Sequence, residues 1–180
     1  MNAIIENLLT RRSTRAFLQK EIPDNELNEI LQAAIYAPSG MGKQTWKFTV
    51  LCNQEKIQQL AELIGRKLGR KGYDMYRPQV LIIPSNQKEN PHGMEDNACA
   101  LENIFLAAHS FGIGSVWINQ LRTLCDDPEV RALLDEFEIP SDHVVYGMAA
   151  LGYPADAPKK EIHKSERSGL SNKTDRRFYR

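Results

Sequence analysis

The part of the sequence best suited to bind an anion is a short run near the N-terminus, Arg11-Arg12-Ser13-Thr14-Arg15. A guanidinium group can donate two parallel hydrogen bonds to phosphate oxygens, and the hydroxyl of Ser13 adds a neutral donor. The run therefore suits a phosphate site. It equally fits a solvated basic face, or charge compensation at the C-terminus of a helix, and neither of these needs a ligand.

Two glycine-rich segments resemble nucleotide-binding motifs but lack residues that define them. Residues 40–45 (Gly-Met-Gly-Lys-Gln-Thr) lack the first glycine of a P-loop, and we expect them to follow a helix instead of a strand. Residues 112–114 (Gly-Ile-Gly) have no third glycine, which leaves a helix C-cap or a close backbone approach as their role. The four histidines and three cysteines have no metal-ligand spacing, so we expect no metal site.

Hydrophobic spacing predicts the elements that must position these residues. We expect helices at the N-terminus, from Pro23 to Pro38, over 54–68, over 96–110 and from Asp127 onward, and strands over 46–52, 79–84, 113–118 and 143–151. Residues 85–95 are polar and predict a loop. This order predicts a mixed α/β fold in which helices pack on the faces of a sheet.

Length and composition favour one domain with a core of its own. The chain has 180 residues, of which 42% are hydrophobic, and this excludes wholesale disorder. Its 23 basic and 23 acidic side chains balance, so no net charge favours nucleic acid or an anionic membrane as a partner. No apolar run approaches the roughly 20 residues that span a bilayer, and the N-terminus does not resemble a signal peptide. The three widely spaced cysteines indicate a reducing compartment, which predicts a cytoplasmic protein.

The charge balance is an average over two unlike segments. Residues 1–158 carry a net charge of −5, whereas residues 159–180 carry eight basic and three acidic side chains, a net charge of +5. The division predicts a folded domain over 1–158 and a basic C-terminal extension over 159–180. Composition leaves open whether this extension is a frayed terminus or wraps around another surface.

Four segments, in order, resemble the signatures of the nitroreductase family of FMN flavoproteins. Residues 11–17 resemble the pattern Arg-[Arg/His]-Ser-x-[Arg/Lys], and residues 37–48 resemble Ala-Pro-Ser-x-x-Asn-x-Gln-Pro-Trp-x-Phe. Residues 97–120 resemble the family's central helix running into Gly-[Leu/Ile]-Gly-Ser-x-Trp, and residues 150–154 resemble Leu-Gly-Tyr-Pro. Together the segments cover residues 8–165, which makes the resemblance specific at the level of the family.

The resemblance implies an α+β fold with a central, mostly antiparallel sheet flanked by helices. It also implies a homodimer with two FMN sites at the subunit interface and a C-terminal tail that crosses to the partner. Arg11 and Ser13 match positions that hold the FMN phosphate, and Arg15 matches a basic position near the pyrimidine edge of the flavin. The backbone of Ile113 and Gly114 matches the part of the chain that approaches the flavin ring.

The remaining matches come from the second and last segments. Residues 38–40 match the stretch that lines the flavin ring from the partner subunit, and Gln44 matches the glutamine of the motif. Lys159 and Lys160 lie where relatives often carry a second cationic contact to the phosphate. The candidate cofactor-binding residues are therefore Arg11, Arg12, Ser13, Arg15, Pro38, Ser39, Gly40, Gly42, Gln44, Ile113, Gly114, Lys159 and Lys160.

The implied activity is hydride transfer from NADH or NADPH, through flavin N5, to a small electron-poor acceptor such as a nitroaromatic or a quinone. This chemistry requires no protein acid or base, so we predict no catalytic residue. Two positions depart from the motif, since Gly42 replaces its Asn and Thr45 replaces its Pro. Other flavin chemistry, such as dehalogenation or dehydrogenation, and a non-catalytic FMN-binding module remain as alternatives. The substrate channel of larger members has little room here, unless residues 85–95 serve as a lid.

Overall fold

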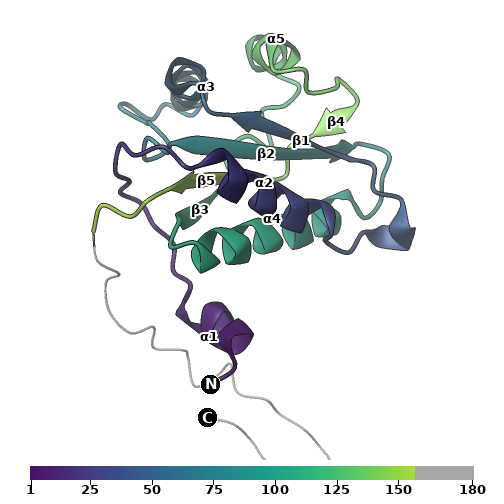
Figure 1. The fold of residues 1–180 in the computed structure, drawn as a ribbon. Helices are drawn as coiled ribbons and strands as arrows, with labels where there is room; N and C mark the ends of the chain where they lie inside the picture. The colour runs from purple at the N-terminus through teal and green to yellow at the C-terminus, as the bar shows by residue number, and fades with distance from the viewer. Residues whose placement is uncertain (157–180) are drawn as a thin grey trace, which may run out of the picture.

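The predicted alternation of helices and strands is present in the computed structural model of the protein, which describes residues 1–156 (Figure 1). The α-helices of this part of the chain are α1 (Ala3–Thr10), α2 (Asp24–Ile35), α3 (Gln54–Lys67), α4 (Gly93–Ser110) and α5 (Pro128–Glu136). The strands are β1 (Trp46–Leu51), β2 (Val80–Gln87), β3 (Gly114–Ile118), β4 (His143–Val144) and β5 (Met148–Gly152). A 3-10 turn, η1 (Gly40–Gly42), lies between α2 and β1.

The five strands form one antiparallel sheet in the order β1-β2-β5-β3, with β4 paired to the far end of β2. Strand β2 is central, and all its residues before Gln87 are buried. Its first part pairs with β5 in a register that places Val80 opposite Leu151 and Ile82 opposite Ala149. The prediction of an α+β fold with a mostly antiparallel sheet is therefore confirmed.

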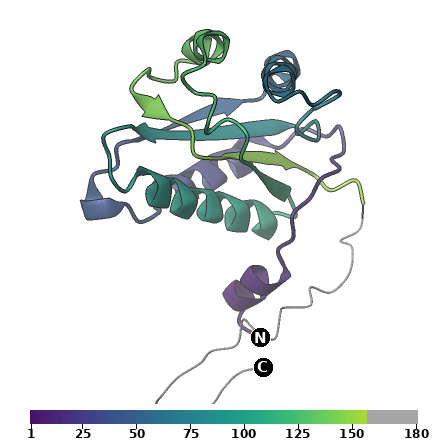
Figure 2. The same cartoon turned by 180° about the vertical axis from the view of Figure 1, so that it is seen from behind.

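Helices cover both faces of the sheet (Figures 1 and 2). Helices α2 and α4 pack on one face around Ile30, Ile82 and Leu101, which are fully buried. Helices α3 and α5 cover the other face in a second apolar cluster that includes Leu60 and Leu134. No helix within residues 1–156 is long and apolar enough to cross a membrane.

Helix α1 stands apart from this layered body, beyond one end of α4 (Figure 1). None of its residues is buried, and Ile4 and Leu9 are 72% and 59% exposed. Its apolar side chains follow helical spacing, as predicted, but the chain's own core does not cover them.

The prediction of a loop over 85–95 is wrong at both ends. Strand β2 continues to Gln87 and α4 begins at Gly93, which leaves only residues 88–92 as a connection. The polar side chains misled the prediction because Ser85 and Asn86 are fully buried and hydrogen-bonded. Asn90, in the short connection that remains, is buried as well. The predicted strand over 143–151 is likewise divided into β4 and β5.

Candidate functional site

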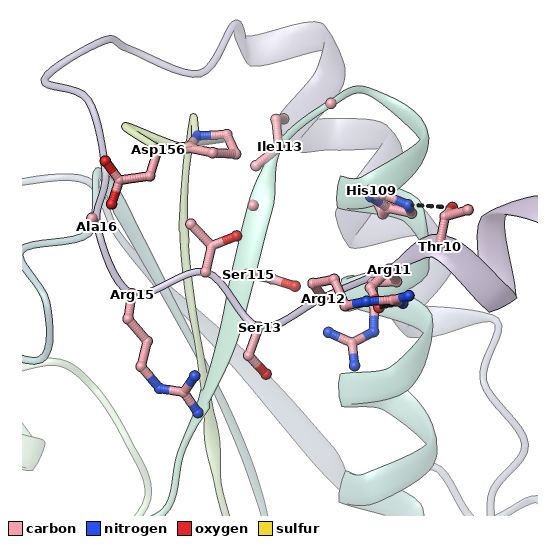
Figure 3. Close-up of a pocket in the computed structure, with 14 residues that line it drawn as sticks. Thr10, Arg11, Arg12, Ser13, Arg15, Ala16, His109, Ile113, Ser115 and Asp156 are labelled. Atoms are coloured by element: carbon pink, nitrogen blue, oxygen red, sulfur yellow. Dashed lines mark hydrogen bonds between the residues drawn. The ribbon is translucent and has the colours of Figure 1, made fainter. Parts of the chain in front are cut away.

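A cavity of about 720 Å³ opens at the C-terminal end of α4 (Figure 3). Three segments distant in sequence form its wall: residues 10–16, residues 109–115, and the stretch that follows β5. The lining residues are Thr10, Arg11, Arg12, Ser13, Thr14, Arg15, Ala16, His109, Gly112, Ile113, Gly114, Ser115, Pro154 and Asp156. The cavity thus brings together six of the predicted cofactor-binding residues, namely Arg11, Arg12, Ser13, Arg15, Ile113 and Gly114.

The arginine-rich segment is held in the cavity wall by pairing with the edge of the sheet. Ser13 and Ser115 form a parallel bridge, and the amide of Thr14 donates to the carbonyl of Ser115 at 2.9 Å. Further along, Phe17 forms a bridge with Pro154. Residues 13–17 therefore extend the sheet next to β3 and β5, and this pairing fixes the position of their backbone.

Glycine at position 114 is required by this pairing. A Cβ atom there would lie 2.5 Å from Oγ1 and 2.7 Å from Cβ of Thr14. The close backbone approach that the sequence suggested for Gly114 is thus an approach to the segment that carries the arginines. Gly112 fills the other suggested role, because it ends α4 with a φ of +72°, a left-handed conformation that favours glycine.

The three arginines differ in what they contact. Arg12 donates through Nη1 to the carbonyls of Leu9 and Arg11, both at 2.8 Å, so it satisfies the C-terminal end of α1. The guanidinium of Arg11 lies over the ring of Phe105, 5.8 Å from its centroid. Arg15 is exposed and lies apart from the other two in Figure 3. Arg12 thus compensates the end of a helix, whereas Arg11 and Arg15 have no carboxylate partner within residues 1–156.

Helix α1 is fixed to the last turn of α4 by two polar contacts. Asn7 Nδ2 donates to the carbonyl of Leu106 at 2.9 Å, and His109 Nε2 lies 2.9 Å from Thr10 Oγ1. His109 was not among the predicted site residues, because no spacing to another motif residue marks it in the sequence. Burial lowers the pKa of His109, and the positive charges of Arg11 and Arg12 lower it further.

A buried hydroxyl in the cavity wall has no partner in the described part of the chain. Ser115 is 1% exposed, and its Oγ makes no hydrogen bond within residues 1–156. An unpaired buried hydroxyl is unfavourable, so a polar ligand atom in the cavity would satisfy it. The sequence contained Ser115 within a recognised segment but gave no reason to single it out.

The other predicted residues lie at the opposite end of α4. The amide of Gly40 donates to Asp96 Oδ1, in the first turn of the helix, at 2.6 Å. The ring of His92 packs so closely on Gly40 that a Cβ there would lie 2.6 Å from it. Asp96 and His109 are thirteen residues apart, about 20 Å along a helix that rises 1.5 Å per residue. Within one chain, residues 38–44 are therefore not brought to the cavity.

A buried polar cluster anchors this second segment. Thr45 Oγ1 donates to Asn86 Oδ1 at 2.7 Å and accepts from Asn90 Nδ2 at 2.9 Å. Asn90 Nδ2 also lies 3.0 Å from Asp96 Oδ2. The backbone of Met41, Gly42 and Gln44 adopts positive φ, at 56°, 65° and 48°. Lys159 and Lys160, the last predicted pair, lie outside the described residues.

The residues that line the cavity combine hydrogen-bond donors with apolar groups. Arg11, Arg15 and Ser13 offer charged and neutral donors, and the only carboxylate among the described lining residues is that of Asp156. A volume of 720 Å³ falls in the range of about 300–1,000 Å³ that is usual for sites of small ligands and cofactors. Such a cavity can bind a phosphate group together with an attached organic body.

Comparison with known proteins identifies what this arrangement resembles. The family model described as "Nitroreductase family" matches residues 8–79 and 67–153. A crystal structure of a nitroreductase with bound FMN from Bacteroides fragilis is 42% identical, covers 96% of this chain and 100% of its own, and superposes with a TM-score of 0.89. An FMN-dependent nitroreductase from Clostridium difficile is 31% identical, with coverages of 94% and 99% and a TM-score of 0.79. The NADPH-flavin oxidoreductase of Vibrio harveyi is 28% identical over 88% of this chain and 69% of its own.

Proposed function

The chain belongs to the nitroreductase family, and from that premise we propose that it is an FMN-dependent oxidoreductase. In this proposal it takes a hydride from NADH or NADPH and passes the electrons to a small electron-poor acceptor such as a nitroaromatic or a quinone. The observation that carries the proposal is the cavity that joins Arg11 and Ser13 to the backbone at Gly114. Its relatives, which include a nitroreductase with bound FMN and an NADPH-flavin oxidoreductase, support the same choice.

The residues of the cavity fit FMN. Arg11 and Ser13 supply charged and neutral donors for the dianionic phosphate, and the unpaired Ser115 hydroxyl offers a further hydrogen bond. Ala16, Pro154 and the backbone at Ile113 and Gly114 also line the cavity and leave a less polar surface for an aromatic ring system. FMN carries both parts, a phosphate and a flat aromatic body, on one molecule.

Bound FMN would supply the redox chemistry, accepting a hydride at N5 and giving up electrons from the same face, so that donor and acceptor use the site in turn. The protein would bind and orient the cofactor and supply charge. The resemblance places Arg15 near the pyrimidine edge of the flavin, where its cation would stabilise negative charge that develops on reduction. Arg15 is exposed, and no carboxylate within residues 1–156 pairs with it, so its charge is available for this role.

The protein would act as a homodimer. Residues 38–44 and the cavity belong to the same predicted site, yet they lie at opposite ends of α4. A second copy that runs antiparallel along α4 would bring residues 38–44 of one chain to the cavity of the other. The uncovered apolar side chains of α1, such as Ile4 and Leu9, would be buried by the same association. Sedimentation of a dimer supports this arrangement, and a monomer that binds FMN normally would contradict it.

We propose the same division of the chain as the charge pattern predicts. Residues 1–158 form the flavin-binding domain, and the basic extension 159–180 lies over the partner subunit. Lys159 and Lys160 then contribute a second cationic contact to the phosphate. A chain ending at residue 158 should bind FMN more weakly than the full chain.

The absorption spectrum of the purified protein is the first experiment. The expected result is a yellow protein that loses its colour under NADH or NADPH without oxygen and regains it when an acceptor is added. Bound FMN that neither nicotinamide reduces would favour the non-catalytic module, and protein that takes up no FMN would refute the proposal. A panel of nitroaromatic, quinone and halogenated acceptors then separates the proposed activity from dehalogenation.

A further inference from the structure

His109 lies in the last turn of α4 at the edge of the cavity, beside the side chains of Arg11 and Arg12 (Figure 3). The imidazole is half-buried, and its Nε2 is 2.9 Å from Thr10 Oγ1. Thr10 immediately precedes the arginine-rich segment. His109 is therefore the side chain of α4 that connects the helix to the start of the proposed phosphate site.

The hydrogen bonds of Thr10 determine which nitrogen of His109 carries the proton. The Thr10 hydroxyl donates its single proton to the carbonyl of Glu6, at 2.7 Å. It must therefore accept from His109, so the neutral imidazole is protonated at Nε2. Nδ1 is left as the nitrogen that can take up a further proton.

The charges around His109 oppose that uptake in the protein alone. Burial lowers the pKa of His109 first, and Arg11 and Arg12, which follow α1, lower it further. Arg15 and Asp156 are the other charged residues that line the cavity within residues 1–156. A phosphate dianion placed among Arg11, Arg12 and Ser13 would offset the positive charges of the two arginines. It would thereby favour a third positive charge, on His109.

We propose that His109 is a further phosphate-binding residue of this cavity, one that takes up a proton when the phosphate group enters. The inference rests on the proposed function, because FMN is the ligand that brings the phosphate. Protonation at Nδ1 leaves the bond from Nε2 to Thr10 intact, so the ring keeps its place while its charge changes. Binding of the phosphate and of one proton is then coupled, and acidification toward neutral pH strengthens cofactor binding.

The test measures FMN and riboflavin affinity from about pH 8.5 to about pH 6.5, by flavin fluorescence, for the wild-type protein and His109→Gln. Glutamine can still donate to Thr10 but cannot be protonated. FMN should bind the wild-type protein more tightly as the pH falls, by at most about tenfold per pH unit, the limit for one coupled proton. In His109→Gln, the part of this pH dependence that comes from protonation of residue 109 should be absent. The phosphate of FMN titrates itself near pH 6, equally for both proteins, so their difference isolates His109.

Riboflavin, which has the flavin ring but no phosphate, should show no such difference between the two proteins. The matched control is His143→Gln, since His143 also has a pKa lowered by burial but lies outside the cavity lining. It should keep the wild-type pH dependence. Calorimetry in two buffers of different ionisation enthalpy should detect proton uptake with FMN by the wild-type protein and less by His109→Gln.

The outcomes separate this inference from the proposed function. FMN binding with the same pH dependence in the wild-type protein and His109→Gln refutes the role of His109 and leaves the proposed function in place. An equal loss of pH dependence with riboflavin also refutes it, because the effect would then not involve the phosphate. If neither flavin binds any of the proteins, the proposed function is wrong and the inference falls with it.

Discussion

Substituting Gly114 by alanine should displace the arginine-rich segment from the sheet. The added Cβ would lie 2.5 Å from Oγ1, 2.7 Å from Cβ and 2.8 Å from Cγ2 of Thr14, all closer than the non-bonded contacts that Cβ atoms make in proteins. Overpacking of this kind typically costs about 1–3 kcal/mol. Separation of the two segments would also lose the hydrogen bond from the Thr14 amide to Ser115, worth about 0.5–1.5 kcal/mol. We expect Gly114→Ala to lower the free energy of unfolding by about 1.5–4.5 kcal/mol, the sum of these two terms.

The same displacement should weaken FMN binding, because Arg11 and Ser13 would no longer face the cavity. Loss of one charged hydrogen bond alone costs about 1.5–3 kcal/mol, which corresponds to a dissociation constant raised at least about tenfold. Urea denaturation gives the stability, and flavin fluorescence gives the affinity at a temperature where the variant is folded.

Two further variants make this prediction specific. Thr14→Gly removes the three atoms nearest to the new methyl group, so it should recover most of the loss when combined with Gly114→Ala, with a coupling energy of about 1–3 kcal/mol. Gly69→Ala is the matched control: it has a φ of +65° but no atom within 4 Å of the new Cβ. It should lower stability through backbone strain, by about 1–2 kcal/mol, without changing FMN affinity. If Thr14→Gly does not restore FMN binding to Gly114→Ala, the close approach is not what requires glycine.

Three other predictions concern single side chains. Arg11→Ala should weaken FMN binding by about 1.5–3 kcal/mol, with little effect on folding because Arg11 is only half-buried. Riboflavin binding should change less. If the variant retains FMN through dialysis, the assignment of Arg11 to the phosphate is contradicted. Thr45→Val should lower the free energy of unfolding by about 1–3 kcal/mol, because Asn86 and Asn90 would each lose a hydrogen-bond partner. A urea midpoint equal to that of the wild-type protein would contradict a stabilising role for these hydrogen bonds. Burial lowers the pKa of His109 and His143 below 6.5, so near that pH the unfolded chain binds more protons than the folded protein. Without cofactor, the free energy of unfolding should therefore be highest above about pH 6.5 and should fall as the pH is lowered. The fall should be less steep in His143→Gln. Urea midpoints at about pH 7.5 and about pH 5.5 in phosphate-free buffer measure this slope.

Local patterns predicted the elements well because each has a strong period or a clear end signal. Asp127 followed by Pro128 marked the start of α5, and the structure confirms that the Asp127 carboxylate accepts from the amides of Glu129 and Val130. The polar end of β2 was missed for a physical reason. Ser85 Oγ and Asn86 Oδ1 are hydrogen-bonded in the interior by partners distant in sequence, His143 and Thr45. Such partners cannot be identified from the segment's own composition.

Residue types and spacing marked only the separate parts of the candidate site, and the family resemblance alone grouped them into one cofactor site. The donor-rich segment 11–15 and the glycines at 112 and 114 were recognised separately, and the sheet pairing of Ser13 with Ser115 joins them. His109 and Asp156 enter the cavity only because of that pairing and of the position of α1. A side chain that becomes functional through tertiary position alone carries no local signal in one sequence.

The two departures from the family motif have different physical meanings. Gly42 replaces an asparagine at a position with a φ of +65°, and asparagine and glycine are the residues that most readily adopt this conformation. The replacement therefore preserves the backbone and removes only a side-chain amide. Thr45 replaces a proline but uses its hydroxyl to join Asn86 and Asn90, a contact that proline cannot make. The segment is thus held in position by other means, and the departures should alter hydrogen bonding to the flavin more than the shape of the site. Substituting Gly42→Asn should accordingly leave stability near wild type while shifting the flavin reduction potential, and a large loss of stability would refute this interpretation.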